Sequence, residues 1–363
     1  MMSDIKFRSK APKEIQFSKE LKKRVRSYFK DSGITTKGDF SMHVKSVAML
    51  GLYLIPFIIL LSVELSAWFA LLMVVLMGIG EAGIGMSVMH DAVHGAYSNK
   101  KWVNRLVGSS MYLLGSNTIN WKIQHNVNHH SFTNIYGQDP DISTKAIIRL
   151  SDHAPLKKYH RFQQFYAFPL YGLMTISKFF GEISSFLGYN REGLIKRMNG
   201  KPAIELTKLI LTKLIYLFII IGLPLLLTTF SIWQVLIGFM IMHLIAGMIM
   251  STVFQMAHVV QGVYQPIPDH GIIPSGRLVH QLRATSDFGK KGGILSWFLG
   301  GLDFQVEHHL FPNICHVHYA AIAPIVEQTA KEYGVTYNTN RTFAHAIVSH
   351  YKRLKELGRT NPT

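Results

Sequence analysis

Two long apolar blocks alternate with polar, basic blocks along the chain. Residues 46–99 and 214–276 contain no lysine or arginine, so all 38 basic residues lie outside these blocks. A membrane-crossing helix needs about 20 mostly apolar residues, and each block is long enough for two. The pattern therefore predicts two helical hairpins with turns near Glu64 and Ser231. The four expected spans are 47–63, 66–89, 209–230 and 233–257.

The apolar runs favour a bilayer over a soluble core. Residues 214–227 read LIYLFIIIGLPLLL, and a helix that is apolar all round belongs in a core or a membrane. The chain supplies no set of polar helices that would cover such a hairpin in water. We therefore expect an all-α integral membrane protein.

Outside the spans, helical periodicity continues in three shorter segments. Phe17, Leu21, Val25 and Phe29 lie four apart among basic residues, which predicts an amphipathic helix on an anionic lipid surface. Residues 319–333 and 342–357 are each followed by glycine, a common helix end. They predict short helices of a helical cap, or simple packing over the C-terminal tail.

Composition agrees with the membrane prediction. The chain is 48% hydrophobic and 16% charged, against about 25% charged residues in soluble domains. Its net charge of +17 is confined to blocks, a pattern unlike that of nucleic-acid-binding proteins, so we expect no nucleic-acid partner. The single cysteine, Cys315, excludes an internal disulfide. No cleavable signal peptide is expected, because the first 45 residues are polar and basic.

The charge pattern also predicts an orientation. With four spans, the basic segments 1–45, 100–213 and 277–363 fall on one side of the membrane. Positively charged segments stay cytoplasmic, so this side is predicted to face the cytoplasm.

Three histidine clusters lie on the same predicted side. They read HDAVH at 90–94, HNVNHH at 125–130 and QVEHH at 305–309. Histidines four apart share one face of an α-helix, with the third histidine of the middle cluster about a hundred degrees around from its neighbour. Clusters this tight predict metal binding by His90, His94, His125, His129, His130, His308 and His309.

The number of histidines indicates how many metal ions the site would hold. Seven ligands exceed one tetrahedral zinc site, and imidazole suits iron, copper, nickel and zinc alike. The count favours two metals, and redox-active iron gives a membrane enzyme a use for them. Asp91 and Glu307 sit beside these ligands. We expect them to orient imidazole rings; the alternative is helix capping.

The three clusters, with their order and spacing around the two hairpins, resemble the histidine boxes of the membrane fatty-acid desaturase family. Gln305 in the third box resembles the front-end, linoleoyl-CoA (delta-6) type group. The resemblance covers nearly the whole chain and implies one membrane desaturase domain, 1–363. Its expected parts are a basic N-terminal segment (1–45), first hairpin and box one (46–99), cytoplasmic segment with box two (100–207), second hairpin (208–257) and cytoplasmic cap with box three (258–363).

The resemblance also implies chemistry. It implies that two iron ions use O2 to introduce a cis double bond into a fatty acyl chain bound to coenzyme A or a lipid. His258 matches a further family ligand at the end of the fourth span, and Gln305 is expected either to bind iron or to hydrogen-bond a bound water. No fused cytochrome b5 domain is expected, because no His-Pro-Gly-Gly motif occurs. Electrons are therefore expected from a separate carrier such as ferredoxin or cytochrome b5, at a bacterial inner membrane.

Two alternatives remain open on the sequence. Related di-iron hydroxylases and oxygenases use similar boxes, and a membrane metal carrier is a non-enzymatic alternative. Carriers place ligands near the middle of the bilayer, whereas these clusters lie outside the spans. Substrate-binding residues are not identified. The span residues Trp68, Phe69, Met73, Met77 and Met86 line an acyl tunnel or only contact lipid and other helices.

Overall fold

The computed structural model describes residues 5–143, 147–289 and 293–360. Contacts within the chain define two compact units. Unit 1 comprises Met1–Gly38, Gln124–Ala167 and Val253–Thr363, and unit 2 comprises Asp39–Ile123 and Phe168–Thr252.

Unit 2 holds the apolar helices. Its elements, with the last turns of α12 belonging to unit 1, are α2 (Phe40–Ser62), α3 (Ala67–Gly83), the π-helix η1 (Ile84–Val88), α4 (Met89–Val93), α5 (Lys101–Gly108), the 3-10 helix η2 (Ser109–Leu114), α6 (Thr118–Trp121), α8 (Met174–Arg191), α9 (Leu194–Arg197), α10 (Pro202–Leu217), the π-helix η5 (Phe218–Gly222), α11 (Leu223–Leu227) and α12 (Ile232–His258).

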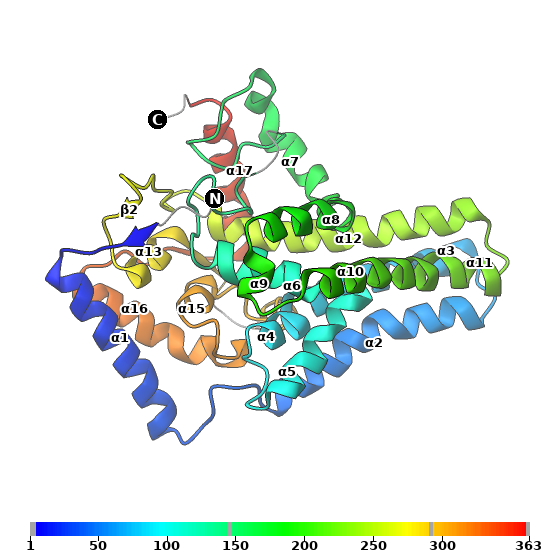
Figure 1. Ribbon diagram of the computed structural model, residues 1–363, viewed down its shortest axis with the longest axis horizontal. Coiled ribbons are helices and arrows are strands. Elements are labelled where there is room, and N and C mark those ends of the chain that lie inside the picture. The colour runs from blue at the N-terminus through cyan, green and yellow to red at the C-terminus, as the bar shows by residue number, and fades with distance from the viewer. Residues whose placement is uncertain (1–4, 144–146, 290–292, 361–363) are drawn as a thin grey trace. The chain divides into compact units, whose positions relative to one another are not determined.

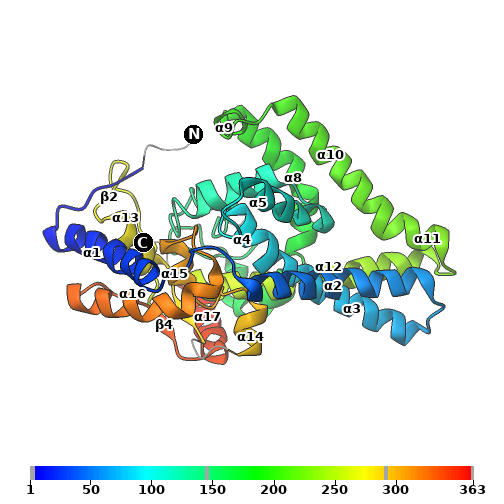
Figure 2. The same ribbon diagram turned by 90° about the horizontal axis from the view of Figure 1, so that it is seen from below.

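The four predicted spans are confirmed as helices long and apolar enough to cross a membrane. They run over Phe40–Ser62, Ala67–Val93, Pro202–Leu227 and Ile232–His258. Both hairpin turns lie at the same end of these helices (Figures 1 and 2), as the two-hairpin prediction requires. The first span begins earlier than expected, because Asp39 caps it by accepting from the amide of Met42 at 3.2 Å.

Close backbone packing joins the first hairpin. A Cβ on Gly80 of α3 would lie 2.6 Å from the amide nitrogen of Tyr53 on α2, so only glycine permits this approach.

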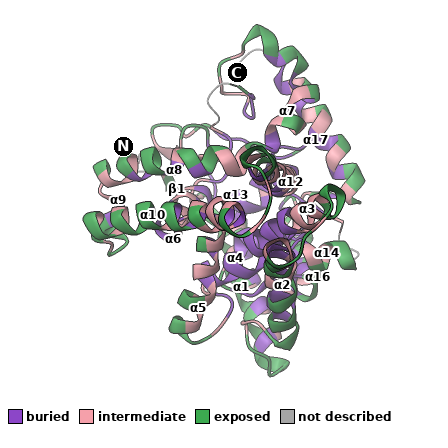
Figure 3. Cartoon of the chain, turned by 90° about the vertical axis from the view of Figure 1, so that its right-hand side faces the viewer, coloured by how far each residue is buried: buried purple, intermediate pink, exposed green. Residues whose placement is uncertain are grey.

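Helix α10, in contrast, packs little against the rest of the protein. Only 22% of the apolar window of its span is buried inside the protein, and Figure 3 shows α10 largely exposed. Exposed leucine and isoleucine side chains there are suited to contact lipid acyl chains.

Unit 1 contains shorter elements and two small parallel strand pairs, β1 with β2 and β3 with β4. Its elements, two of which continue into unit 2, are β1 (Lys6–Phe7), α1 (Pro12–Asp31), the π-helix η3 (Lys122–His129), the 3-10 helix η4 (Lys158–Phe162), α7 (Gln163–Tyr171), β2 (Ile272–Ile273), α13 (Arg277–Ala284), β3 (Asp287–Phe288), α14 (Ile294–Phe298), α15 (Gln305–Leu310), the 3-10 helix η6 (His316–His318), α16 (Tyr319–Tyr333), β4 (Thr339–Asn340) and α17 (Phe343–Leu357).

The predicted amphipathic helix near the N-terminus exists, but the surface assigned to it was wrong. The apolar residues of α1 do not face lipid; they are buried in the core of unit 1 together with residues of α13, α15 and α16. Figures 1 and 2 show α1 and α16 side by side. The apolar stripe of α1 packs against other apolar side chains of unit 1, and the basic side of the helix stays exposed. The stripe consists of Phe17, Leu21, Val25 and Phe29.

The two predicted C-terminal helices are confirmed. Helix α16 ends at Tyr333, and Gly334 follows it in the left-handed conformation with φ 68°, which glycine adopts without steric cost. Helix α17 begins after Thr342, whose side chain accepts from the amide of His345 at 3.1 Å.

Candidate metal centre

The second histidine cluster lies on a π-helix rather than on an α-helix. At the end of η3, the amide of His130 donates to the carbonyl of His125 at 3.0 Å, a bond between residues five apart. This wider turn brings the rings of His125 and His130 together, with centroids 4.7 Å apart and Nε2 atoms 3.2 Å apart. The α-helical expectation for His130 was therefore wrong in geometry. Short π-helical segments are frequent at functional sites.

Unit 1 brings six of the predicted histidines together in overlapping groups. Ligand atoms of His129, His258 and His309 lie within 4.8 Å of one another, and so do those of His130, His308 and His309. His125 forms a further such group with His129 and Asp141. Neighbouring sets of buried imidazoles have the donor chemistry of adjacent metal positions, and imidazole is a good ligand for iron.

A carboxylate fixes the ring of His129. Its Nδ1 lies 3.0 Å and 3.1 Å from the two carboxylate oxygens of Asp139. The amides of Asn134 and Asp141 donate to that carboxylate at 2.8 Å and 3.0 Å, so the acceptor is itself held. A ring that donates from Nδ1 is the tautomer whose Nε2 can bind a metal.

Two rings of the third box are held through Nδ1 in the same way. His309 Nδ1 lies 2.9 Å from Oε1 of Gln281, and the Gln281 amide nitrogen donates to the carbonyl of His130 at 3.0 Å. His308 Nδ1 lies 3.3 Å from the hydroxyl of Tyr319. Gln281 thus links the His309 ring of box three to the His130 carbonyl of box two. These two bonds hold the two boxes in place relative to each other.

Sequence reasoning missed Asp139, Gln281 and Tyr319 as partners of the candidate ligands. Asp139 carried a usable signal, because it follows box two within ten residues and is paired with Asp141. Gln281 and Tyr319 carried none, since each reaches its histidine only through the folding of unit 1. The nearby His280 binds the carbonyl of Thr133 through Nε2 at 2.9 Å, and burial lowers its pKa to about 4.

His258 and Gln305 occupy the ends of their helices. His258 is the last residue of α12, with its ring centroid 4.7 Å from that of His129 and 4.8 Å from that of His309. Its Nδ1 lies 3.4 Å from the carbonyl of Ala284. Gln305 is buried and begins α15, the short helix that carries His308 and His309.

The carboxylate of Glu307 accepts a hydrogen bond from a tyrosine. The hydroxyl of Tyr337 donates to Glu307 at 3.0 Å and also to Asp287. Burial and the neighbouring Asp287 carboxylate raise the pKa of Glu307 well above its ordinary value. Asp287 in turn accepts from the amide of Val306 at 2.8 Å. These contacts fix α15 and thereby the backbone of His308.

Unit 2 carries the first histidine cluster at the end of its second span. The π-helix η1 precedes α4, and the rings of His90 and His94 have centroids 4.8 Å apart. Both rings contact Trp121 edge-on, at 5.6 Å and 5.8 Å between centroids. The carboxylate of Asp91 lies 3.9 Å from His90 Nδ1. The predicted pair is therefore close together, as its four-residue spacing requires.

A different histidine lies inside the spans of unit 2. His243 Nδ1 is 3.3 Å from the carboxylate of Glu81 and 3.2 Å from the hydroxyl of Thr175. His243 Nε2 is 2.9 Å from the hydroxyl of Tyr216. Because protein groups occupy both ring nitrogens, this buried histidine holds helices together and is not a metal ligand.

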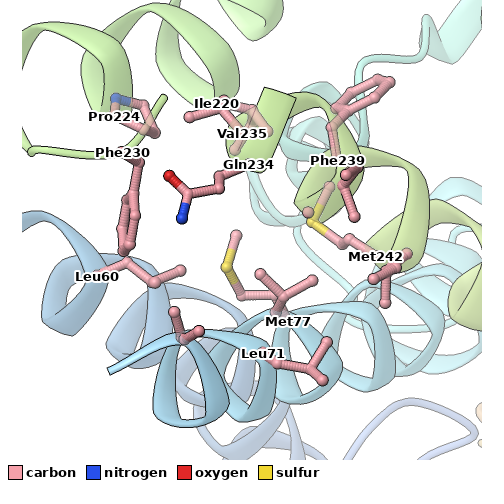
Figure 4. A pocket seen from close by; sticks show the side chains of 16 residues that line it. Leu60, Leu71, Met77, Ile220, Pro224, Phe230, Gln234, Val235, Phe239 and Met242 are labelled. Carbon is pink, nitrogen blue, oxygen red and sulfur yellow. The ribbon is translucent and has the colours of Figure 1, made fainter. Parts of the chain in front are cut away.

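An apolar pocket of about 210 Å³ lies between the spans, and Figure 4 shows its lining side chains. Met77 lines it, whereas Trp68 and Phe69 are exposed on the outside of α3. Its lining on α3 ends at Met77, 13 residues before His90, or about 20 Å along a helix. This pocket therefore lies far from the first cluster.

The chain was compared with known proteins. Residues 66–341 match the family model for fatty acid desaturases. The acyl-lipid (8-3)-desaturase of Physcomitrium patens is 36% identical over 94% of this chain and 71% of its own length. The sn-1 linoleoyl-lipid 6-desaturase of Synechocystis sp. is 33% identical over 95% and 96%, and that of Arthrospira platensis is 30% identical over 95% and 93%.

Proposed function

The chain belongs to the fatty acid desaturase family, and we propose that it introduces a cis double bond into the acyl chain of a membrane lipid with consumption of O2. The observation that carries this proposal is the convergence of six buried histidines in unit 1. Relatives named for acyl-lipid and linoleoyl-lipid desaturation support a lipid-bound substrate.

We propose two iron ions as the cofactor. When bound and reduced by electrons from an external carrier, they would activate O2, the oxidant that an unactivated C–H bond requires. The donor set of unit 1 supports this choice, because imidazole suits iron and the groups overlap. Gln305 is a further candidate through its amide oxygen. The proposed histidine ligands are His90, His94, His125, His129, His130, His258, His308 and His309.

The chain's own residues would hold the ligands in place. Asp139 orients His129 and favours a proton on Nδ1, while Gln281 does the same for His309. Such partners typically change metal affinity or activity by about 10- to 100-fold. For Asp91 and Glu307 we propose a related orienting role, in which Glu307 acts by fixing α15 through Tyr337. The burial of these groups excludes bulk water from the site.

We further propose that the histidines face the cytoplasm at a bacterial inner membrane. The alternation of basic and apolar segments supports this orientation, with all 363 residues acting as one desaturase domain. The same basic surface suits an acidic electron carrier such as ferredoxin or cytochrome b5. Both hairpin turns lie at one end of the spans (Figure 1), and within unit 2 the first histidine cluster lies at the other end of the second span.

Expression in a host fed defined fatty acids tests the proposal. We expect gas chromatography to show an acyl product with one additional cis double bond. His129→Ala should abolish it, whereas His345→Ala, on the exposed side of α17, should not. A new hydroxyl in place of the double bond would favour the hydroxylase alternative, and unchanged output from His129→Ala would contradict the site. Purified protein holding one labile zinc would support a carrier.

A further inference from the structure

A second, polar pocket lies beside the first histidine cluster within unit 2. Its volume is about 530 Å³, within the range of small-molecule sites. His94 belongs to its wall, so whatever fills the pocket lies next to a candidate ligand. The lining residues are Ala92, Val93, His94, Gly95, Lys101, Asn104, Arg105, Gly108, Thr118 and Lys122.

The charge of this pocket has one sign. Lys101, Arg105 and Lys122 line it, and no carboxylate does. Across the part of the chain that the structure describes, none of these three forms an ion pair with an aspartate or glutamate. Three cations gathered around one cavity without a counter-ion favour an anionic ligand, and arginine and lysine are common phosphate binders.

The helix that supplies two of these cations also carries an exposed apolar side. On α5, Trp102 is 59% exposed and Leu106 is 63% exposed, and residues four apart share one face of a helix. Lys101 and Arg105 form a second pair with the same spacing on the pocket side. Tryptophan beside basic residues just after a span is typical of a helix at the lipid–water interface. The exposed apolar side of α5 therefore suits contact with lipid beside the pocket.

We propose that this pocket binds the phosphate of an anionic glycerophospholipid whose acyl chain is the substrate. The inference rests on the proposed function and names the acyl carrier. Coenzyme A also carries phosphates, but the exposed Trp102 and Leu106 favour a ligand that arrives from the bilayer. Because His94 lines the same pocket, a phosphate held there keeps the ester-linked end of the acyl chain beside the first histidine cluster.

Lipid binding tests the site without activity. The full-length protein in detergent is titrated with phosphatidylglycerol or with a diacylglycerol bearing an uncharged sugar, and retained lipid is measured by native mass spectrometry. We expect preference for phosphatidylglycerol, weakened about tenfold (about 1.4 kcal/mol) by Arg105→Gln or Lys122→Gln, because each change removes a charged hydrogen-bond donor to the phosphate. Lys100→Gln, an exposed neighbour outside the pocket, should bind normally. Equal binding of both lipids, or an equal loss in Lys100→Gln, would overturn the proposal.

Activity then distinguishes the source of the phosphate. In vesicles that contain the iron-loaded protein and an electron donor, we expect new double bonds on phosphatidylglycerol and a higher KM with similar kcat for Lys122→Gln. Faster desaturation of added acyl-coenzyme A, or of the uncharged lipid, would overturn the phospholipid assignment. If no carrier is desaturated but the charge-dependent lipid binding persists, the proposed function fails and the phosphate site stands.

Discussion

The buried histidines of unit 1 and the buried His243 of unit 2 are held in different ways. In unit 1, His129 and His309 use Nδ1 toward a carboxylate and an amide oxygen, and both residues belong to groups whose ligand atoms lie within 4.8 Å of one another. In the spans, Glu81, Thr175 and Tyr216 take both ring nitrogens of His243. Burial alone therefore does not identify a metal ligand; the grouping of its ring with other candidate ligand atoms does.

The sharpest way to break this comparison is to remove one histidine of each kind. His309→Ala should reduce desaturation to background and remove most of the bound iron, because His309 belongs to two of the candidate groups. His243→Ala should keep the iron, since protein groups hold its ring. Metal content by atomic absorption and product by gas chromatography measure both effects. Loss of iron from His243→Ala alone would reverse the assignment.

A second prediction, with a smaller expected effect, tests how the Nδ1 partner of His129 contributes to iron binding. Asp139→Asn keeps the shape of the side chain but removes the negative charge that holds His129. We expect iron affinity and activity to fall by about 10- to 100-fold, as for other partners of metal-binding imidazoles. Iron release to a chelator measures the affinity. Asp269→Asn changes an exposed aspartate of unit 1 and should release iron at the parent rate; an unaltered Asp139→Asn would show that the carboxylate only fixes the loop.

Apolar patterning was sufficient to predict the spans of unit 2. A helix that is apolar on every side is stable only in a protein core or a bilayer. The four helices and both turns could therefore be predicted from the lysine-free blocks. Helix starts were less well predicted, because the cap at Asp39 and the proline at the first position of α10, Pro202, lie outside the apolar windows.

Periodicity predicted the helices of unit 1 but not what they pack against. The stripe of α1 has the same spacing whether lipid or α16 covers it, and only the fold shows the buried contacts of Phe17. The histidine boxes gave the candidate ligands, whereas the π-helical turn that pairs His125 with His130 has no simple sequence signal. Gln281 was equally unpredictable, because it meets His309 from another helix.

The comparison extends to a further buried histidine, His350, through the dependence of folding stability on pH. His350 on α17 lies with Nδ1 2.6 Å from the carbonyl of Val259, and burial lowers its pKa from 6.5 to about 4. The folded state therefore keeps this ring neutral while the unfolded chain binds a proton below about pH 6.5, so its contribution to stability is lost as pH falls toward 4.

Between about pH 7.5 and about pH 5 this difference corresponds to about 2 kcal/mol. We expect the thermal midpoint of the parent protein to fall by a few degrees more than that of His350→Gln, whose amide can still donate to Val259. The exposed His345→Gln on the same helix should follow the parent. Parallel pH profiles for the parent and His350→Gln would mean that the buried ring accepts its proton within the folded state, as a hydrogen-bonded but hydrated histidine does.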